Sequence, residues 1–579
     1  MTLNDSGLDV ANVAAHLPKM ARDQPNTPAI IAPRAGLFGS SAVDQTSYRE
    51  LDEESDFYAS GLREIGLTQG ARVVLMVPPS LPFFALTFGM FKAGVVPVVL
   101  DPAMGRERLS ACIARSEPVG FIGIPKAHIA RRALGWGKGS IRANVVVGHG
   151  AALMGLGDAH TVSLEALRAL GVKRGRARLA PVSEDDTAAI LFTSGSTGVP
   201  KGAVYSHGNF VAQVESIRTM YEIHPGEIDL PTFPLFALFD PALGMTTIIP
   251  RMDFTKPGSV NGADIVGAIQ RFRVTNMFGS PALLDRVAEY AQAKGEKLPT
   301  LRRVITAGAP VTPRILERFS ALLSPEARIH TPYGATESLP IATIGHRTVL
   351  DTTRAATDRG EGICVGQPVR TAKVFIMRID DAPRETLGDE MPMGEVGEIC
   401  VSGPQVTHAY FRDAQNTALH KMKDAEERIW HRVGDVGYRD SNGRIWFCGR
   451  KAHRVVVGEK TYFSEQVEGP FNALSWVKRS AFVGAKHDGR IAPTIILETW
   501  SGGVPAGNVA LGFPPELIDA MQGTLVSLRF HPRFPVDPRH NAKIDRDALA
   551  QWASDEFAKG NAGLSWRELK TLRARPGIK

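Results

Sequence analysis

The sequence predicts an α/β protein whose sheets are largely parallel. Two short apolar segments, Val73–Val77 and Val95–Leu100, lie on either side of a helical segment, Phe83–Ala93. A β-α-β order of this kind favours parallel strands with helices on both faces of the sheet. Two further apolar segments, Ala188–Phe192 and Val304–Thr306, read as buried strands that run into glycine-containing turns.

The composition is that of a globular protein with more than one domain. At 579 residues, 44% hydrophobic and 22% charged, the chain is long enough for two to four domains with a sizeable core. The net charge of +7 is spread along the chain, apart from a basic end at Lys570–Lys579. Without a clustered basic face we expect no nucleic-acid binding. A solvated surface is the simpler interpretation, and peripheral contact with an anionic membrane or an acidic partner is the alternative.

The four cysteines are widely spaced and form no CxxC pair, which argues against a zinc site or a disulfide framework. The first residues lack the basic and apolar regions of a signal peptide. No run of about eighteen apolar residues occurs, so we expect no transmembrane helix. Together these features predict a cytoplasmic protein.

The first elements along the chain can be placed by their boundary residues. Helices are predicted at Val10–Leu17, ended by Pro18, and at Arg49–Ile65. The second would start within Thr46–Leu51, which has hydroxyls for the cap and an acid for the first turn. Gly94 should end the helix before it as a left-handed cap. The Lys92-Ala93-Gly94 segment is expected to be structural and not catalytic.

The stretch between Leu191 and Gly202 is the strongest functional motif. It follows a predicted strand and combines glycines, hydroxyls and one lysine, Lys201. Glycines let backbone N–H groups approach an anion closely, and hydroxyls and an ammonium add donors. The stretch therefore predicts a loop that holds a polyphosphate. Its phosphate-contacting residues are Thr193, Ser194, Gly195, Ser196, Thr197 and Gly198.

This loop lacks the spacing of a Walker A motif, because Gly195, Gly198 and Lys201 are followed by another glycine. It resembles instead the phosphate loop of the adenylate-forming superfamily, which includes acyl-CoA synthetases, luciferases and peptide-synthetase adenylation domains. The resemblance implies an enzyme that binds ATP. A Gly/Ser-rich surface loop is the alternative interpretation of the stretch taken alone.

A second motif, Tyr333-Gly334-Ala335-Thr336-Glu337, lies downstream as it does in this superfamily. Tyr333 offers a flat face on which a base can stack, and Thr336 can donate to a phosphate. Glu337 can bind Mg²⁺, which prefers carboxylate and phosphate oxygens. A simple turn before a helix is the alternative.

Further roles are implied by the resemblance alone. Gly308 and Ala309 would lie along the adenine, Asp435 would bind the ribose and Arg450 would contact the nucleotide. Lys543 would contact the carboxylate and the α-phosphate. The implied large domain, residues 1–449, contains two parallel-type α/β subdomains and a small β-barrel-like subdomain. A hinge at 450–454 would join it to a small mobile α+β lid, residues 455–579.

The substrate pocket should lie along Phe233–Pro241 and near Gly279, where the superfamily places the acyl group. We expect Phe236, Ala237, Phe239 and Gly279 to line it, although core packing is an alternative. Ala237 replaces a histidine that many acyl-CoA synthetases have there. Asp240 precedes a proline and is expected to cap a helix rather than to act in catalysis.

Three segments, Phe233–Phe239, Gly449–Val455 and Phe534–Ile544, resemble the β-lactone synthetases of bacterial long-chain olefin biosynthesis. This resemblance implies that a β-hydroxy acid is activated as acyl-AMP and that its own hydroxyl then closes a lactone. His453, His540, Asp240 and the leaving phosphate are candidate bases. A decarboxylase and a reductase would be functional partners. The alternatives are a long-chain fatty acyl-CoA ligase and, more remotely, a non-catalytic nucleotide-binding protein.

Replacing Lys543 tests the assigned chemistry. Negative charge grows on the phosphate during attack, and a preorganised ammonium stabilises it. Lys543→Ala should slow acid-dependent pyrophosphate release by at least about a hundredfold. An unchanged rate would contradict the role given to Lys543.

Overall fold

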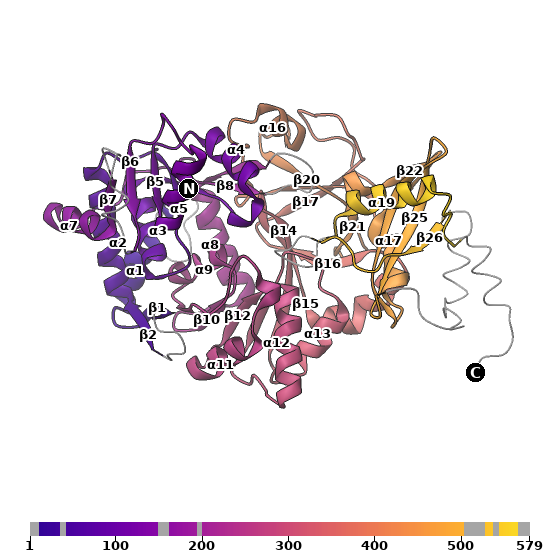
Figure 1. Ribbon diagram of the computed structural model, residues 1–579, viewed down its shortest axis with the longest axis horizontal. Coiled ribbons are helices and arrows are strands. Elements are labelled where there is room, and N and C mark those ends of the chain that lie inside the picture. Colours follow the sequence, from indigo (N-terminus) through magenta and orange to yellow (C-terminus); the bar gives the residue numbers. More distant parts are fainter. Residues whose placement is uncertain are drawn as a thin grey trace.

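Four β-sheets organise the described residues, and the two larger ones carry the N-terminal part (Figure 1). The computed structural model describes residues 11–34, 42–148, 161–193, 200–502, 527–536 and 544–564. A small pair of strands and a three-stranded sheet lie C-terminal to the large sheets. The predicted α/β class, with a large N-terminal domain and a smaller C-terminal one, is confirmed.

The first large sheet has seven strands and is parallel except at one edge, where β8 and β9 run antiparallel. In spatial order its strands are β7 (Thr161–Ser163), β6 (Ala143–Val146), β5 (Gly120–Gly123), β3 (Arg72–Met76), β4 (Val96–Val99), β8 (Thr187–Thr193) and β9 (Lys201–Ser206).

The second large sheet has fourteen strands and changes character half-way. Its parallel part consists of β1 (Pro28–Pro33), β11 (Thr246–Ile248), β10 (Ile228–Pro231), β12 (Asn276–Gly279), β13 (Arg303–Thr306) and β14 (Arg328–Ala335), with β2 (Val43–Ser47) antiparallel at its edge. Its antiparallel part is β15 (Ser338–Gly345), β16 (Ile363–Pro368), β21 (Ile445–Arg450), β20 (Ile429–Arg439), β18 (Gly397–Ser402), β17 (Lys373–Met377) and β19 (Lys421–Lys423).

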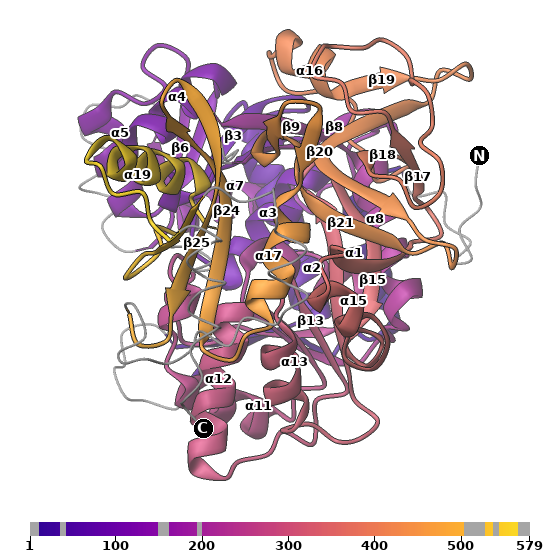
Figure 2. The same ribbon diagram turned by 90° about the vertical axis from the view of Figure 1, so that its right-hand side faces the viewer.

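The C-terminal unit stands beside β16 and β21 and faces the viewer in Figure 2. It contains the pair β22 (Val455–Val457) and β23 (Lys460–Tyr462), and the sheet β24 (Val477–His487), β25 (Arg490–Thr499) and β26 (Ser527–Phe530). The described residues of this unit include the helices α17 (Ser464–Asn472) and α19 (Arg546–Ala558). The chain enters this unit from Arg450 through a short 3-10 helix, Lys451–His453, so the hinge predicted at 450–454 stays a prediction.

Helices cover the large sheets, as the β-α-β order predicts. Around the seven-stranded sheet and the N-terminus lie α1 (His16–Asp23), α2 (Tyr48–Glu64), α3 (Leu81–Ala93), α4 (Arg106–Ser116), α5 (Pro125–Leu134) and α7 (Leu164–Arg174). The remaining helices of the large domain are α8 (His207–Tyr221), α9 (Pro234–Ala237), α10 (Asp240–Leu243), α11 (Gly262–Phe272), α12 (Pro281–Lys294), α13 (Pro313–Ser320), α14 (His346–Thr348), α15 (Arg354–Asp358) and α16 (Ala414–His420).

A buried ion cluster joins α2 to α3. Lys92 Nζ lies 2.6 Å from carboxylate oxygens of both Asp52 and Asp56, and Lys92 is fully buried. Arg176 pairs with the same two carboxylates from the surface side. The two acids on α2 therefore share two cations, and the Lys92 segment is structural, as predicted.

The predicted boundaries hold where capping chemistry determines them. Ser47 and Glu50 form a capping box at the start of α2, and Gly94 ends α3 in the left-handed conformation at φ 72°. The prediction that Pro18 ends a helix is wrong. Pro18 lies in the first turn of α1, where a backbone N–H has no intrahelical acceptor, so the missing N–H of proline costs no hydrogen bond. None of the helices in the described ranges has the length and hydropathy needed to cross a membrane.

Replacing Lys92 by Met should destabilise the large domain. The change leaves two buried carboxylates with only the half-exposed Arg176, and breaking a buried ion pair commonly costs about 3–5 kcal/mol. The decrease in the free energy of unfolding is measured from the first unfolding transition in urea. Arg34→Ala, which breaks an exposed pair with Asp44, is the control and should cost no more than about 1 kcal/mol. Equal losses for the two variants would contradict the stabilising role given to the buried Lys92 cluster.

Candidate active site

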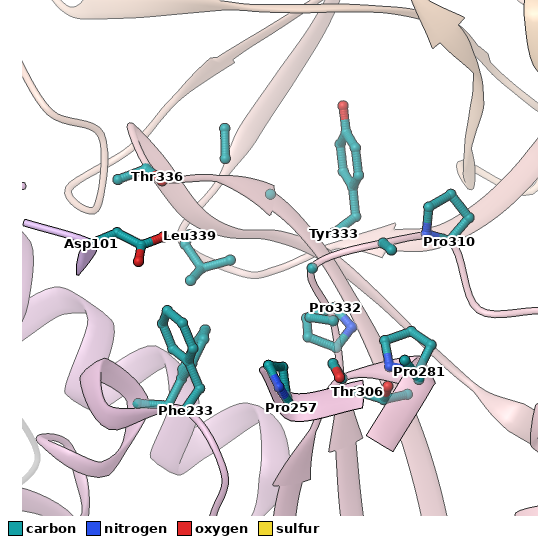
Figure 3. Close-up of a pocket in the computed structure, with 18 of the residues that line it drawn as sticks. Asp101, Phe233, Pro257, Pro281, Thr306, Pro310, Pro332, Tyr333, Thr336 and Leu339 are labelled. Atoms are coloured by element: carbon teal, nitrogen blue, oxygen red, sulfur yellow. The ribbon is translucent and has the colours of Figure 1, made fainter. Parts of the chain in front are cut away.

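A large cavity of about 2680 Å³ reaches from the two large sheets to the C-terminal unit. Leu191 and Lys201 of the first sheet, Tyr333 of the second and Arg546 of the C-terminal unit all line it. Figure 3 shows part of its wall, where Tyr333, Thr306 and Asp101 come from different strand ends. Within the part of the chain that the structure describes, residues from the separate motifs therefore line one cavity.

Tyr333, Asp435 and Arg450 form a triad joined by one hydrogen bond and one ion pair. The Tyr333 hydroxyl donates to Asp435 Oδ2 at 2.7 Å, and Arg450 Nη1 lies 3.0 Å from Asp435 Oδ1. Asp435 and Arg450 are partners across β20 and β21, and Asp435 is only 4% exposed. The carboxylate of Asp435 is the main reason that the pKa of Arg450 is raised. The ring of Tyr333 is thus held in place by its hydroxyl on the cavity wall.

Thr336 and Glu337 lie in the turn between β14 and β15, so they belong to a hairpin and not to the start of a helix. The backbone oxygen of Thr336 accepts a hydrogen bond from the Tyr205 hydroxyl. The Tyr410 hydroxyl donates to Glu337 Oε1 at 2.6 Å. Both motif residues line the cavity, and Tyr410 orients the carboxylate of Glu337.

Lys201 begins β9 and points its ammonium at a histidine that sequence reasoning missed. Lys201 Nζ lies 2.8 Å from His420 Nε2 and 5.4 Å from the centre of the Tyr410 ring. Burial lowers the pKa of Lys201, while the carboxylate of Glu337 acts in the opposite direction. His420 and Tyr410 lie more than 200 residues after Lys201, and no local pattern marks them.

The expected adenine segment follows β13. Gly308 and Ala309 line the cavity beside Thr306. Gly308 has φ 95°, a conformation that residues with a Cβ rarely adopt. This glycine is required by the backbone turn that brings the segment to the cavity wall.

The predicted substrate pocket is only partly where it was expected. Phe236 and Phe239 line the cavity, and Phe236 stacks on Phe278 with ring centres 4.1 Å apart. Ala237 is 3% exposed and packs in the apolar core instead. Gly279 is buried at the end of β12, where an added Cβ would meet Leu283 at 3.1 Å.

Asp240 has a different role from the helix cap that was predicted. Phe239 holds the cap position of α10, and no side chain caps that helix. The Asp240 carboxyl accepts from Thr247 Oγ1 at 3.0 Å and hydrogen-bonds with Asp229. Burial raises the pKa of both carboxyls, and the charge of Asp229 raises that of Asp240 further. Asp240 is 3% exposed and absent from the residues that line the cavity, which argues against its candidacy as a base.

His453, another candidate base, does line the cavity. Burial, with a contribution from Arg546, lowers its pKa to about 4, so its ring is neutral near pH 7. His540, Lys543 and the loop residues Ser194–Gly198 lie outside the described residues, as does the side chain of Thr193. The strands that flank the loop are present, with Thr193 opposite Lys201 across β8 and β9.

Residues 17–411 match the family model described as AMP-binding enzyme. The chain belongs to the AMP-binding enzyme family. This AMP-binding enzyme is 46% identical over 559 residues to an olefin β-lactone synthetase of Stenotrophomonas maltophilia, covering 95% of this chain and 99% of the relative. It is 26% identical to a long-chain-fatty-acid–CoA ligase of Salmonella typhimurium, covering 76% and 80% of the two chains. The fold matches ATP-bound MatB from Rhodopseudomonas palustris with a TM-score of 0.71 and 21% identity, over 94% of this chain and 99% of MatB.

Replacing Asp240 by Asn should change how stability depends on pH. Because the pKa values of Asp229 and Asp240 are raised on folding, the folded protein binds more protons than the unfolded chain above the ordinary aspartate pKa. Wild-type stability should therefore fall as the pH rises through the window between the ordinary and the raised values. Asp240→Asn should flatten this fall by up to about 1.4 kcal/mol per pH unit.

Thermal unfolding of both proteins between about pH 5 and 8, a range set by the raised pKa values, measures the effect. Asp44→Asn removes an exposed carboxylate and should leave the slope unchanged. A variant slope as steep as that of the wild type would contradict the interpretation of the buried pair.

Proposed function

We propose that this AMP-binding enzyme activates a long-chain β-hydroxy acid with MgATP and then closes it to a β-lactone, releasing AMP and pyrophosphate. The observation that carries the proposal is the 46% identity to an olefin β-lactone synthetase over nearly the full length of both chains. The CoA ligase is only 26% identical and covers less of the chain. The aromatic cavity wall at Phe236, Phe239 and Phe278 supports an apolar acid.

The polar end of the cavity suits a nucleotide. Tyr333 would stack on the adenine, which would lie beside Gly308 and Ala309, while Asp435 would accept hydrogen bonds from ribose hydroxyls. Arg450 keeps its charge beside Asp435 and would contact the nucleotide. Lys201 would meet the phosphates from β9, next to the loop 194–198.

Glu337 is the proposed magnesium ligand. Within the described ranges no group of three or more histidine, cysteine or acidic residues could hold a metal. A single carboxylate fits Mg²⁺ that is bound chiefly by substrate phosphates and water. One Glu337 oxygen accepts from Tyr410, which leaves further lone pairs for a cation. When bound, the ion would offset charge on the phosphates.

In the first step a carboxylate oxygen of the acid attacks the α-phosphorus of ATP. A P–O bond forms to give acyl-AMP, and the bond to pyrophosphate breaks. Lys201 and Lys543 would stabilise the charge that develops on the phosphates. Thr336 lies on the same wall and would donate to a phosphate oxygen.

In the second step the β-hydroxyl oxygen of the same molecule attacks the activated carbonyl carbon. A C–O bond closes the four-membered ring, the hydroxyl proton leaves, and AMP departs with the electron pair of the anhydride bond. The cavity must hold the hydroxyl near the carbonyl, and such orientation supplies several kcal/mol. His453 is neutral and lines the cavity, so it could take the proton; the phosphate of departing AMP is the alternative acceptor.

A product assay without CoA tests the proposal. Purified enzyme, MgATP and a long-chain β-hydroxy acid should give AMP, pyrophosphate and a product lighter than the acid by one water, with lactone ring protons in the NMR spectrum. The matching fatty acid without a hydroxyl is the control and should stop at acyl-AMP. Acyl-AMP that accumulates from both acids, and becomes a thioester only when CoA is added, would show that the enzyme is an acyl-CoA ligase.

A further inference from the structure

The contacts of His420 with Arg432 and Lys201 indicate which of its ring nitrogens carries the proton. His420 Nδ1 lies 3.2 Å from the backbone oxygen of Arg432, which can only accept. His420 Nε2 lies 2.8 Å from Lys201 Nζ, and an ammonium can only donate. Nδ1 therefore carries the ring proton, and Nε2 offers its lone pair to Lys201. Burial, followed by the charge of Lys201, lowers the pKa of His420 to about 4 and keeps the ring neutral.

Lys201 has other groups with which it could pair. The carboxylates of Glu337 and Asp413 both act electrostatically on it, and Arg450 acts in the opposite direction. Glu337 is held by Tyr410, and Asp413 is paired with Arg115 at 3.0 Å. Lysine has a flexible four-carbon side chain. Without a neutral partner its ammonium would pair with a carboxylate, which would offset its positive charge.

We propose that His420 is a positioning residue that holds the Lys201 ammonium in place for the phosphates of ATP. A neutral acceptor restrains the ammonium without neutralising it, whereas a carboxylate at that position would cancel its charge. His420 thus keeps Lys201 and Glu337 apart, so that one remains free for phosphate and the other for a cation. The inference rests on the proposed adenylation reaction and names a residue that acts through Lys201.

Two polar replacements separate the two contacts of His420. In His420→Gln the side-chain amide extends as far as the former Nε2 and can still accept a hydrogen bond from Lys201. In His420→Asn the side chain is shorter, so its amide reaches only the former Nδ1 position, next to the Arg432 oxygen. We expect His420→Asn to lower kcat/KM for ATP by about tenfold to a hundredfold, the usual range for a hydrogen bond to a charged group. His420→Gln should retain kcat/KM within about threefold of wild type, and KM for the acid should not change in either variant.

Direct titration with MgATP gives a readout besides turnover and should show the same order of affinities. His128→Leu removes another buried histidine, one that contacts the Val145 backbone, and should leave ATP binding unchanged. Thermal unfolding shows whether each variant folds. In a Lys201→Gln background, His420→Asn should have no further effect, because the two residues act as one unit.

The outcomes are distinct. If His420→Asn binds ATP as wild type does, or if His420→Gln loses as much as His420→Asn, the positioning role is wrong. The role is also wrong if the effects of Lys201→Gln and His420→Asn simply multiply. If the wild type binds MgATP but forms no acyl-AMP or lactone from any β-hydroxy acid, the proposed function fails, and the MgATP titrations still decide the role of His420.

Discussion

The triad of Tyr333, Asp435 and Arg450 is the constraint on which the site depends. It joins the end of β14, the last strand of the parallel part, to the antiparallel pair β20 and β21. Because Asp435 is buried, its charge requires both partners, and a misplaced strand would leave a carboxylate without compensation. The same contact therefore holds the parallel and antiparallel parts of the sheet in register and orients the side chains proposed to bind the nucleoside.

Charged side chains in the cavity are positioned by neutral partners as well as by ion pairs. Lys201 contacts a neutral imidazole and Glu337 contacts a phenol, so each charged group is held by a neutral partner. Elsewhere the protein neutralises charge completely, as in the Lys92 cluster. This difference separates ions that stabilise the fold from ions that remain available to a ligand. Preorganised charge of the second kind is what stabilises a phosphoryl-transfer transition state.

Local chemistry accounts for the predictions that succeeded, and tertiary packing accounts for those that failed. The hydroxyl cap of α2 and the C-cap at Gly94 depend on neighbouring residues only, so the sequence predicts them well. The predictions for Pro18 and Asp240 were wrong because each residue type fits two positions in a helix. Proline can follow a helix or lie in its first turn, and an aspartate before a proline can be the cap or the first helical residue. Packing selected the second position in both cases. Ala237 was expected on the cavity wall, but its side chain packs in the apolar core.

The sequence by itself determined the α/β class, the family and the motif residues Lys201, Tyr333 and Glu337, because short motifs and the alternation of helices and strands along the chain are encoded by adjacent residues. Only the tertiary structure decided which side chains those residues contact. His420 meets Lys201, and Asp435 meets Tyr333, across separations of 219 and 102 residues. Such contacts arise from sheet order and strand register, which depend on packing across the whole domain.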